Sequence, residues 1–214
     1  MLFRSDVDGL ISEWRRKTTD EMFEAFASSL GVKFRFLKAL GAARVEQQTL
    51  ANLHVNAPSD AWAFPMLNGA GKSVGIRLRF IDGEKRAVTG SRAGLFVAKS
   101  IIYTNAEPIY IAEGPTDAAA GLTIGLFTIG RPSCLGNESD VVETVKRLKC
   151  RRVIIVADAD EPGQRGAEKL QQAMRVPSIV WTTPKKDLRA SINAGMERED
   201  VLGATRDLVW SNPK

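Results

Sequence analysis

The sequence predicts an α/β fold, α+β overall, in which a mainly parallel sheet with helices follows a small basic β-hairpin subdomain and an N-terminal helical segment. Residues 107–195 alternate between short apolar runs of strand type and segments of helix type. Residues 58–106 change to a period of two, and residues 1–57 place apolar side chains three and four positions apart. A helical closure is expected over residues 196–214.

The N-terminal segment, residues 1–57, is predicted to be helical throughout. Residues 6–17 and 20–30 carry the helical apolar spacing, and Gly31 fits the end of the second helix. A further short helix is expected over residues 32–40. We assign this segment a structural or DNA-guiding role. His54 stands apart from other metal-ligating residue types, so it is expected to pack or to make a hydrogen bond.

The next segment, residues 58–106, is predicted to form β-hairpins. Asn68-Gly69 and Asp82-Gly83 are tight-turn signals that bracket a strand. Within that strand apolar residues alternate with Arg77 and Arg79, so one face should be buried and the other should present two guanidinium groups. Phosphate groups fit such a surface.

Strand and helix alternate from residue 107 onward. Strands are predicted at 109–112, 125–130, 152–157 and 178–181, and helices at 115–122, 138–149 and 163–175. This order favours a mainly parallel sheet joined by crossover helices. Closing helices are expected at 188–194 and 198–209.

Composition narrows the functional class. The 214 residues are 44% hydrophobic and 26% charged, which is ordinary for a globular protein. The sequence has no apolar run of membrane-spanning length and no signal-peptide pattern at its start, so no membrane association and a cytoplasmic location are expected. Two cysteines and one histidine are too few for a structural zinc site.

Positive charge is concentrated in one stretch. Residues 69–99 hold seven basic and two acidic residues, so this stretch alone equals the net charge of +5 for the whole chain. A basic patch next to an acidic cluster points to a polyanionic partner. A solvated basic face is the alternative. The basic residues are Lys72, Arg77, Arg79, Lys85, Arg86, Arg92 and Lys99.

Two acidic clusters follow predicted strands. Glu113 and Asp117 come after the first strand of the parallel sheet, and Asp158 and Asp160 come after the third. Ligands bind at the carboxyl ends of parallel strands, and converging carboxylates call for a divalent cation such as Mg²⁺ or Mn²⁺. Asp117 also suits the first turn of a helix, where an acid is favourable without any metal. We interpret Glu161 as another first-turn acid.

These motifs carry a family resemblance. Glu113-Gly-x-x-Asp117 followed by Asp158-x-Asp160-x-x-Gly163 resembles the Toprim signature of bacterial-type primases, topoisomerases and some nucleases, and it implies a Rossmann-like Toprim domain over 107–195. Residues 62–96 resemble the basic half of the RNA-polymerase core of phage and bacterial primases. The resemblance makes Asp187 a further candidate metal ligand, whereas Arg189 stands where such domains often carry another acid.

The resemblance implies a DNA primase: metal-dependent synthesis of short RNA primers from NTPs on single-stranded DNA, with Glu113, Asp158 and Asp160 as catalytic residues. Arg77, Arg79, Lys85, Arg86, Arg92 and Lys99 would bind template or triphosphate. The short chain without a zinc module suggests a phage or mobile-element protein, aided by a replicative helicase or a separate DNA-recognition module. A Toprim-type nuclease and an inactive replication factor that binds single strands or a helicase are the alternatives.

Overall fold

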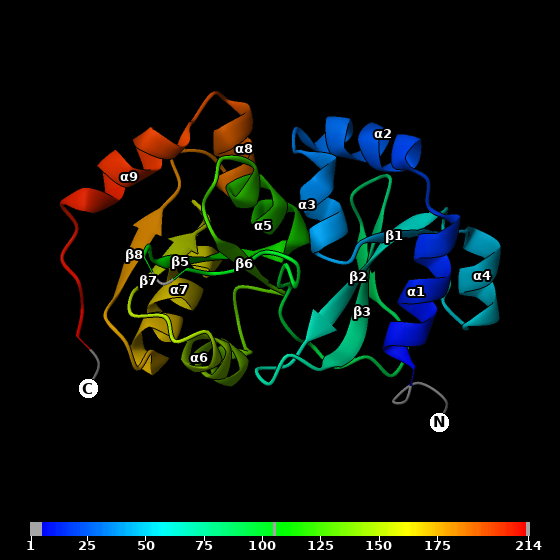
Figure 1. Cartoon of the computed structure of the whole chain (residues 1–214), viewed down its shortest axis with the longest axis horizontal. Coiled ribbons are helices and arrows are strands. Elements are labelled where there is room, and N and C mark those ends of the chain that lie inside the picture. Colours follow the sequence, from blue (N-terminus) through cyan, green and yellow to red (C-terminus); the bar gives the residue numbers. More distant parts are fainter. Residues whose placement is uncertain (1–5, 105, 213–214) are drawn as a thin grey trace.

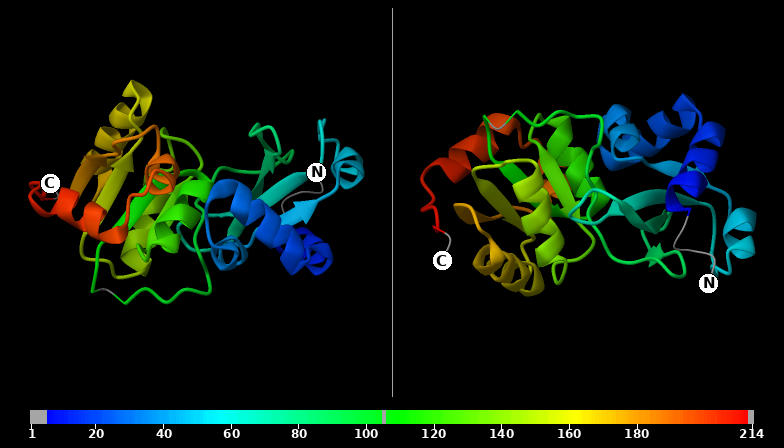
Figure 2. Two further views of the ribbon diagram at one scale, coloured as in Figure 1. Left: turned by 90° about the horizontal axis from the view of Figure 1, so that it is seen from above. Right: turned by 60° about the horizontal axis from the view of Figure 1, so that its bottom comes forward.

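Two four-stranded sheets form the framework of the computed structural model, which describes residues 6–104 and 106–212. They lie side by side, and they stay beside one another in all the views (Figures 1 and 2). No helix in the described part of the chain is long and apolar enough to cross a membrane. The strands are β1 Ala43–Val45, β2 Ala61–Leu67, β3 Ser73–Phe80, β4 Lys85–Ala87, β5 Ile109–Glu113, β6 Thr128–Arg131, β7 Val153–Ala157 and β8 Ser178–Thr182. The helices are α1 Val7–Lys17, α2 Asp20–Leu30, α3 Phe34–Ala39, α4 Gln47–Asn52, α5 Gly114–Thr123, α6 Glu138–Arg147, α7 Glu161–Ala173, α8 Leu188–Asn193 and α9 Arg198–Arg206.

The first sheet is antiparallel, with the order β1-β2-β3-β4. Both predicted turns are confirmed: Asn68 N–H donates to the Lys72 carbonyl at 2.9 Å, and Phe80 N–H donates to the Glu84 carbonyl at 2.9 Å. The strands alternate as expected, because Ile76, Leu78 and Phe80 are buried against α1 and α4. On the other face, β2 packs its aromatic side chains against α2 and α3.

One strand was not predicted. Residues 43–45 form β1 and pair with residues 61–63 of β2, so the prediction that the segment 1–57 is helical is wrong at these three residues. The strand is only three residues long, and partners distant in sequence hold it in place. Strand formation here depends on tertiary pairing that a local pattern does not reveal.

The second sheet is parallel throughout, with the order β6-β5-β7-β8. The predicted alternation of strands and helices over 109–206 is confirmed, with boundaries that differ by a few residues. Its central strands are apolar on both faces because helices cover both: α6 and α7 on one side, and α5, α8 and α9 on the other (Figure 1). Gly114 adopts a φ of 84° between β5 and α5, which permits the sharp reversal at the strand end.

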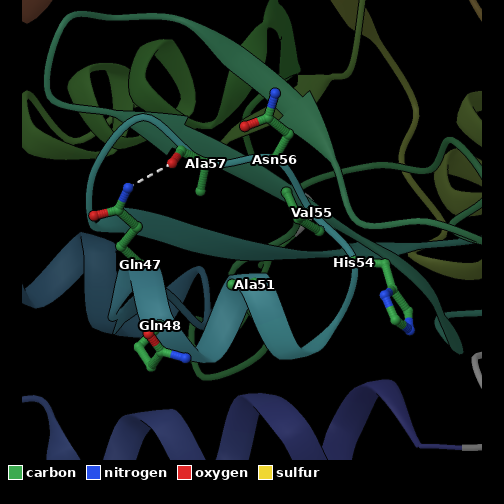
Figure 3. Close-up of a pocket in the computed structure, with 7 residues that line it drawn as sticks. All are labelled: Gln47, Gln48, Ala51, His54, Val55, Asn56 and Ala57. Atoms are coloured by element: carbon green, nitrogen blue, oxygen red, sulfur yellow. Dashed lines mark hydrogen bonds between the residues drawn. The ribbon is translucent and has the colours of Figure 1, made fainter.

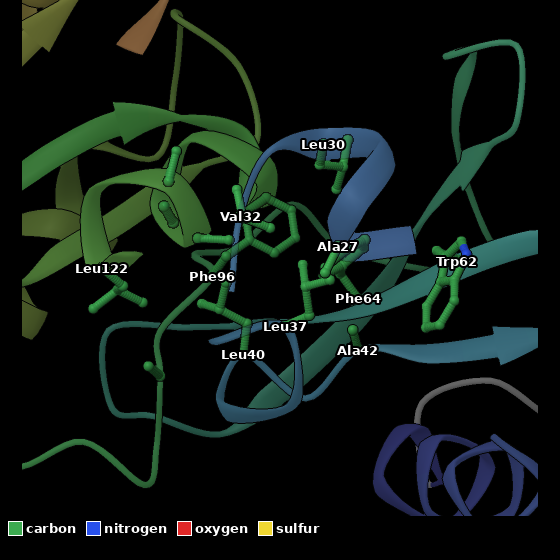
Figure 4. Close-up of a cluster of buried hydrophobic side chains, with 14 of the residues drawn as sticks. Ala27, Leu30, Val32, Leu37, Leu40, Ala42, Trp62, Phe64, Phe96 and Leu122 are labelled. Carbon is green, nitrogen blue, oxygen red and sulfur yellow. The ribbon is translucent and has the colours of Figure 1, made fainter. Parts of the chain in front are cut away.

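The two sheets are joined by backbone and by a shared core. Leu95 bridges Leu67 of β2, and the next residue, Phe96, bridges Gly130 of β6. A hydrophobic cluster unites side chains of α2, α3 and β2 with Ala118–Ala120 and Leu122 of α5 (Figure 4). The proposed division into 1–57, 58–106, 107–195 and 196–214 stays a prediction, but these contacts couple the two halves firmly.

Candidate active site

Five acidic side chains gather at the carboxyl-end edge of the parallel sheet. Glu113 ends β5, and Asp158 directly follows β7, the neighbouring strand. Asp117 lies in the first turn of α5, while Asp160 and Asp187 precede α7 and α8. Because parallel strands open at the same edge, the local order of strand, acid and helix brings these residues together. We call this set the acidic edge.

Asp117 is the most buried member, with 7% of its surface exposed. Its Oδ1 accepts a hydrogen bond from the Arg189 backbone N–H at 2.8 Å, which ties α5 to the start of α8. Burial, followed by the nearby Asp187 carboxylate, raises the pKa of Asp117 to about 7. A first-turn acid at the surface would not be desolvated in this way, so helix capping alone does not explain Asp117.

Asp158 is half-buried, and the negative charges of the other four acids act on its carboxyl group. Burial first, then the charges of Asp117, Glu113, Asp187 and Asp160, raise the pKa of Asp158 to about 7. A Cβ at position 163 would lie 2.9 Å from the Asp158 Cβ, so Gly163 lets α7 begin directly against this side chain. The carboxylates therefore repel one another without a cation between them.

Asp160 and Asp187 also have local structural roles. Asp160 Oδ1 accepts from Gly163 N–H at 2.8 Å and caps α7, and Asp187 Oδ1 accepts from Ala190 N–H at 2.6 Å and caps α8. Each keeps a second carboxylate oxygen for another ligand. Glu161 is an exposed acid in the first turn of α7, and it pairs with Arg165 at 2.9 Å.

The carboxylate oxygens of the acidic edge are ligands of the type that a hard divalent cation prefers. The acidic edge offers only carboxylate oxygens, the ligands that Mg²⁺ and Mn²⁺ prefer, and its mutual repulsion favours a cation. Across residues 6–104 and 106–212, however, no three His, Cys, Asp or Glu side chains stand close enough together to hold a metal ion as they are arranged. Metal binding would therefore require these side chains to turn toward one another, and the metal site remains a proposal.

Three of the predicted basic residues lie within electrostatic range of the acidic edge. Arg77 Nη2 donates to the Pro132 carbonyl at 2.9 Å, and Arg77 lies within electrostatic range of Glu113. Arg79 lies within electrostatic range of Asp117 and Asp187. Lys85 is paired with Arg79 between β3 and β4, and its positive charge favours the ionised form of Asp117. Burial lowers the pKa of both arginines. They nevertheless remain cationic, because the pKa of a guanidinium starts far above neutrality.

The other three predicted basic residues are not brought to the acidic edge. Arg86 pairs with Leu78 across the sheet, so it projects from the opposite face, where its Nε lies 2.7 Å from Glu84 and its guanidinium stacks over Phe80. Arg92 lines a cavity beside α1, and Lys99 lines another.

Arg131 is a structural residue that the sequence reasoning did not identify as such. It is 4% exposed, and its Nη2 donates to the carbonyls of Cys134 at 2.8 Å and Gly136 at 3.0 Å. The guanidinium thus holds the loop after β6 beside the acidic edge. The sequence offered one signal for this role: Arg131 is a charged residue in the last position of a buried strand, β6.

A large open cavity lies elsewhere. It has a volume of about 660 Å³ and surrounds the end of α4, with Gln47 Nε2 donating to the Ala57 carbonyl across it (Figure 3). His54 lines it, and no carboxylate or thiol lines it. Helix α4 lies at the end of the molecule remote from the parallel sheet (Figure 1), so the cavity that it borders is separate from the acidic edge.

Comparisons with known proteins show which solved structures share this fold. No protein-family model and no curated protein matches the sequence. Among solved structures, the Escherichia coli primase catalytic core superposes with a TM-score of 0.70 at 12% identity, covering 95% of this chain and 79% of that one. The fold is that of a DnaG-type primase catalytic core. Two more such cores agree: the DnaG catalytic domain bound to single-stranded DNA (TM-score 0.66, 13% identity, 95% of this chain and 77% of that one) and the primase fragment of the bacteriophage T7 primase-helicase (TM-score 0.61, 16% identity, 83% and 72%).

At these identities the likeness shows the fold alone. The primase-core match extends over both sheets, since it covers 95% of the chain, and it confirms the predicted resemblance to a primase core with a Toprim fold. The Toprim sheet carries the acidic edge, and the antiparallel sheet carries the arginines that face it.

Proposed function

We propose that this chain is a primase-type nucleotidyltransferase core. It would transfer a nucleotidyl group from an NTP to the 3′-hydroxyl of a ribonucleotide on a single-stranded DNA template. The observation that supports this most directly is that Arg77, Arg79 and Lys85 lie within electrostatic range of the acidic edge in a primase-core fold, with Arg77 bonded to the loop after β6. Carboxylates to hold cations and guanidinium groups to hold phosphates are the two requirements of phosphoryl chemistry.

Asp158 and Asp160 are the residues that would hold Mg²⁺ or Mn²⁺, with Glu113, Asp117 and Asp187 as additional ligands. When bound, a divalent ion supplies charge neutralisation for the triphosphate and lowers the pKa of a coordinated hydroxyl. Glu113 is the candidate base for the attacking hydroxyl, because it ends β5 beside Asp158 and makes no capping hydrogen bond. Asp117 supports the arrangement through its hydrogen bond to the start of α8.

The basic side would bind phosphate without reading sequence. Arg77 and Arg79 project from alternate positions of one strand, which suits successive phosphates of a strand or of a triphosphate. Binding of single-stranded DNA should therefore weaken steeply as salt concentration rises. Arg77→Ala should both weaken binding and reduce that salt dependence, because a phosphate contact is lost.

The proposed partners are a single-stranded DNA template, NTPs and a replicative helicase or separate DNA-recognition module. A DnaG catalytic domain bound to single-stranded DNA and a primase fragment from a primase-helicase are among the structures with this fold. The proposal extends those partners to this chain on the strength of the shared fold and the arginines at the acidic edge.

The experiment that tests the proposal is incorporation of labelled NTPs on single-stranded DNA with Mg²⁺ or Mn²⁺. Wild type is compared with Asp158→Asn and with Asp207→Asn, an exposed acid beyond α9, as the control. Short RNA products are expected from wild type and from the control. Asp158→Asn should lower the yield by about a hundredfold or more, since even outer groups around a metal are worth about ten- to a hundredfold.

Other outcomes would replace the proposal. Metal-dependent loss of the template strand without RNA product would indicate a nuclease that uses the same acids. Intact DNA binding with neither activity, unaffected by Mg²⁺ and by Asp158→Asn, would indicate a replication factor without catalysis.

A further inference from the structure

An apolar cavity lies where the two halves of the molecule meet, and we call it the joint cavity. Its volume is about 450 Å³, which is within the range of small-molecule sites. Its walls come from α3, from residues 101–104 and 107 of the connection between the two sheets, and from the turn that joins α5 to β6. The apolar residues used below are Phe36, Ile102, Tyr103 and Phe127.

The joint cavity lies at the opposite end of the parallel strands from the acidic edge. Glu107 stands two residues before β5 and Phe127 directly precedes β6, whereas Glu113 is the last residue of β5. A parallel strand rises about 3.3 Å per residue, so the five residues of β5 separate the two places by about 16 Å. A molecule in the joint cavity therefore leaves the acidic edge free.

The aromatic wall of the joint cavity is fixed by contacts within the chain. The Tyr103 hydroxyl donates to the Glu107 carbonyl at 2.5 Å and lies 3.1 Å from Cys150 Sγ. The Tyr103 ring is tilted against the Phe127 ring, with 5.0 Å between the ring centroids. A wall that is ordered before a ligand arrives lowers the entropy cost of binding.

The mouth of the joint cavity exposes apolar surface. Ile102 lines the cavity although 86% of its surface is exposed to solvent. Phe36 lines it from α3, on the side of the first sheet. An apolar body that entered the cavity would cover both side chains, and removal of that surface from water favours binding.

The charges around the joint cavity favour an anionic group on such a molecule. Arg198 lines the cavity and donates through Nη2 to Glu107, while its Nε has no acceptor in the part of the chain that the structure describes. A guanidinium has five N–H donors, so donors remain for a second carboxylate. The Arg35 guanidinium lies 4.7 Å from the centre of the Phe36 ring and adds a second cation. Two cations therefore stand against one carboxylate, that of Glu107.

We propose that the joint cavity binds a small aromatic carboxylate. Its ring packs between the aromatic side chains, and its carboxylate accepts hydrogen bonds from Arg198. The ligand contacts both halves of the molecule, because Phe36 belongs to the first and Phe127 to the second. This binding site goes beyond the proposed nucleotidyl transfer and does not depend on it.

The test is calorimetric titration of the full chain with 2-naphthoate and with its neutral analogue 2-naphthamide, in EDTA at constant ionic strength. Both should bind at one site per chain. Naphthoate should have a Kd about ten- to a hundredfold lower, which is the gain typical of a hydrogen bond to a charged group. Saturating inorganic tripolyphosphate should leave this Kd unchanged, because it would occupy the arginines near the acidic edge instead.

Two variants locate the site. Arg198→Met should remove the preference for naphthoate, and Arg206→Met, which changes an exposed arginine at the end of the same helix, is its matched control. Ile102→Asn should raise the Kd of both probes about three- to tenfold through lost apolar contact. Ile81→Asn is the control for that change, because Ile81 is also 86% exposed but follows β3.

Several results would overturn the proposal. These are equal affinity for the two probes, displacement of naphthoate by tripolyphosphate, or equal effects of Ile102→Asn and Ile81→Asn. Dimers in sedimentation that Ile102→Asn abolishes would assign the cavity to a second copy of the chain instead. If Arg198→Met does not fold, the comparison of the two probes on the wild type still tests the need for a negative charge. Because no NTP or template is present, failure of this proposal is distinguishable from failure of the proposed function.

Discussion

Asp117→Asn should stabilise the protein at neutral pH while impairing its proposed activity. Asp117 is almost fully buried, and its pKa is raised to about 7 from a usual value of 3.8. Between those two values the folded state holds a proton that the unfolded state releases. Stability therefore falls as pH rises through this window and stays reduced above it. Asparagine has nearly the same shape, and its Oδ1 can still accept from the Arg189 N–H.

The magnitude follows from the size of the pKa change. At about 1.4 kcal/mol per unit, ionising Asp117 in the folded state costs about 4 kcal/mol above pH 7. The new amide places two N–H donors in a buried site, and an unmet donor costs about 1 to 3 kcal/mol. We therefore expect Asp117→Asn to unfold with a free energy about 1 to 3 kcal/mol higher than wild type at pH 8 in EDTA.

Urea unfolding at several pH values between 5 and 8 measures this effect. The advantage of the variant should grow with pH and level off above about 7. Added Mg²⁺ should narrow the gap, because a cation at the acidic edge binds more strongly to the wild type, which has one carboxylate more than the variant. Two results would refute the conclusion that burial raises the pKa of Asp117 to about 7. The variant could be less stable than wild type at pH 8, or its free energy of unfolding could change with pH as steeply as that of wild type.

Two further predictions concern the frame around the acidic edge. Gly130→Ala should cost about 1 to 3 kcal/mol, since the new Cβ would overlap the Gly114 carbonyl oxygen, whereas Gly203→Ala on the exposed face of α9 should stabilise by about 0.5 to 1 kcal/mol. Urea midpoints compare the pair, and equal effects would contradict the close approach of β6 to the start of α5. Arg131→Met should lose about 2 to 4 kcal/mol because buried carbonyls are left unpaired, and it should raise protease sensitivity at Cys134 and beyond. A loss under about 0.5 kcal/mol would mean that other contacts hold that loop.

Much of the acidic edge could be predicted because its signals are local. Glu113 and Asp158 directly follow apolar strand-type runs, and parallel strands necessarily end on a common edge. The alternation of Arg77 with buried neighbours likewise fixed which face of β3 it occupies. In each case a few adjacent residues are sufficient to predict where the side chain lies.

The features that the sequence did not reveal depend on partners distant in sequence. Arg86 lies in the same basic stretch as Lys85, but the register of β4 on β3 turns the two side chains to opposite faces. Strand β1 exists only because β2 pairs with it. Arg189 appeared only as a departure from an acidic pattern, and the hydrogen bond from its backbone N–H to Asp117 depends on α8 packing beside α5.

The core shared between the two sheets has a consequence for synthesis on the ribosome. Phe64 and Phe96 belong to one buried hydrophobic cluster with Ala118–Ala120 and Leu122 of α5. Those α5 residues are made later than the whole antiparallel sheet. In the nascent N-terminal half, α2 and α3 can cover part of this cluster, but the part that α5 covers stays exposed until α5 leaves the exit tunnel. The early folding intermediates should need protection from aggregation during that interval, and folding should be completed in one late cooperative step.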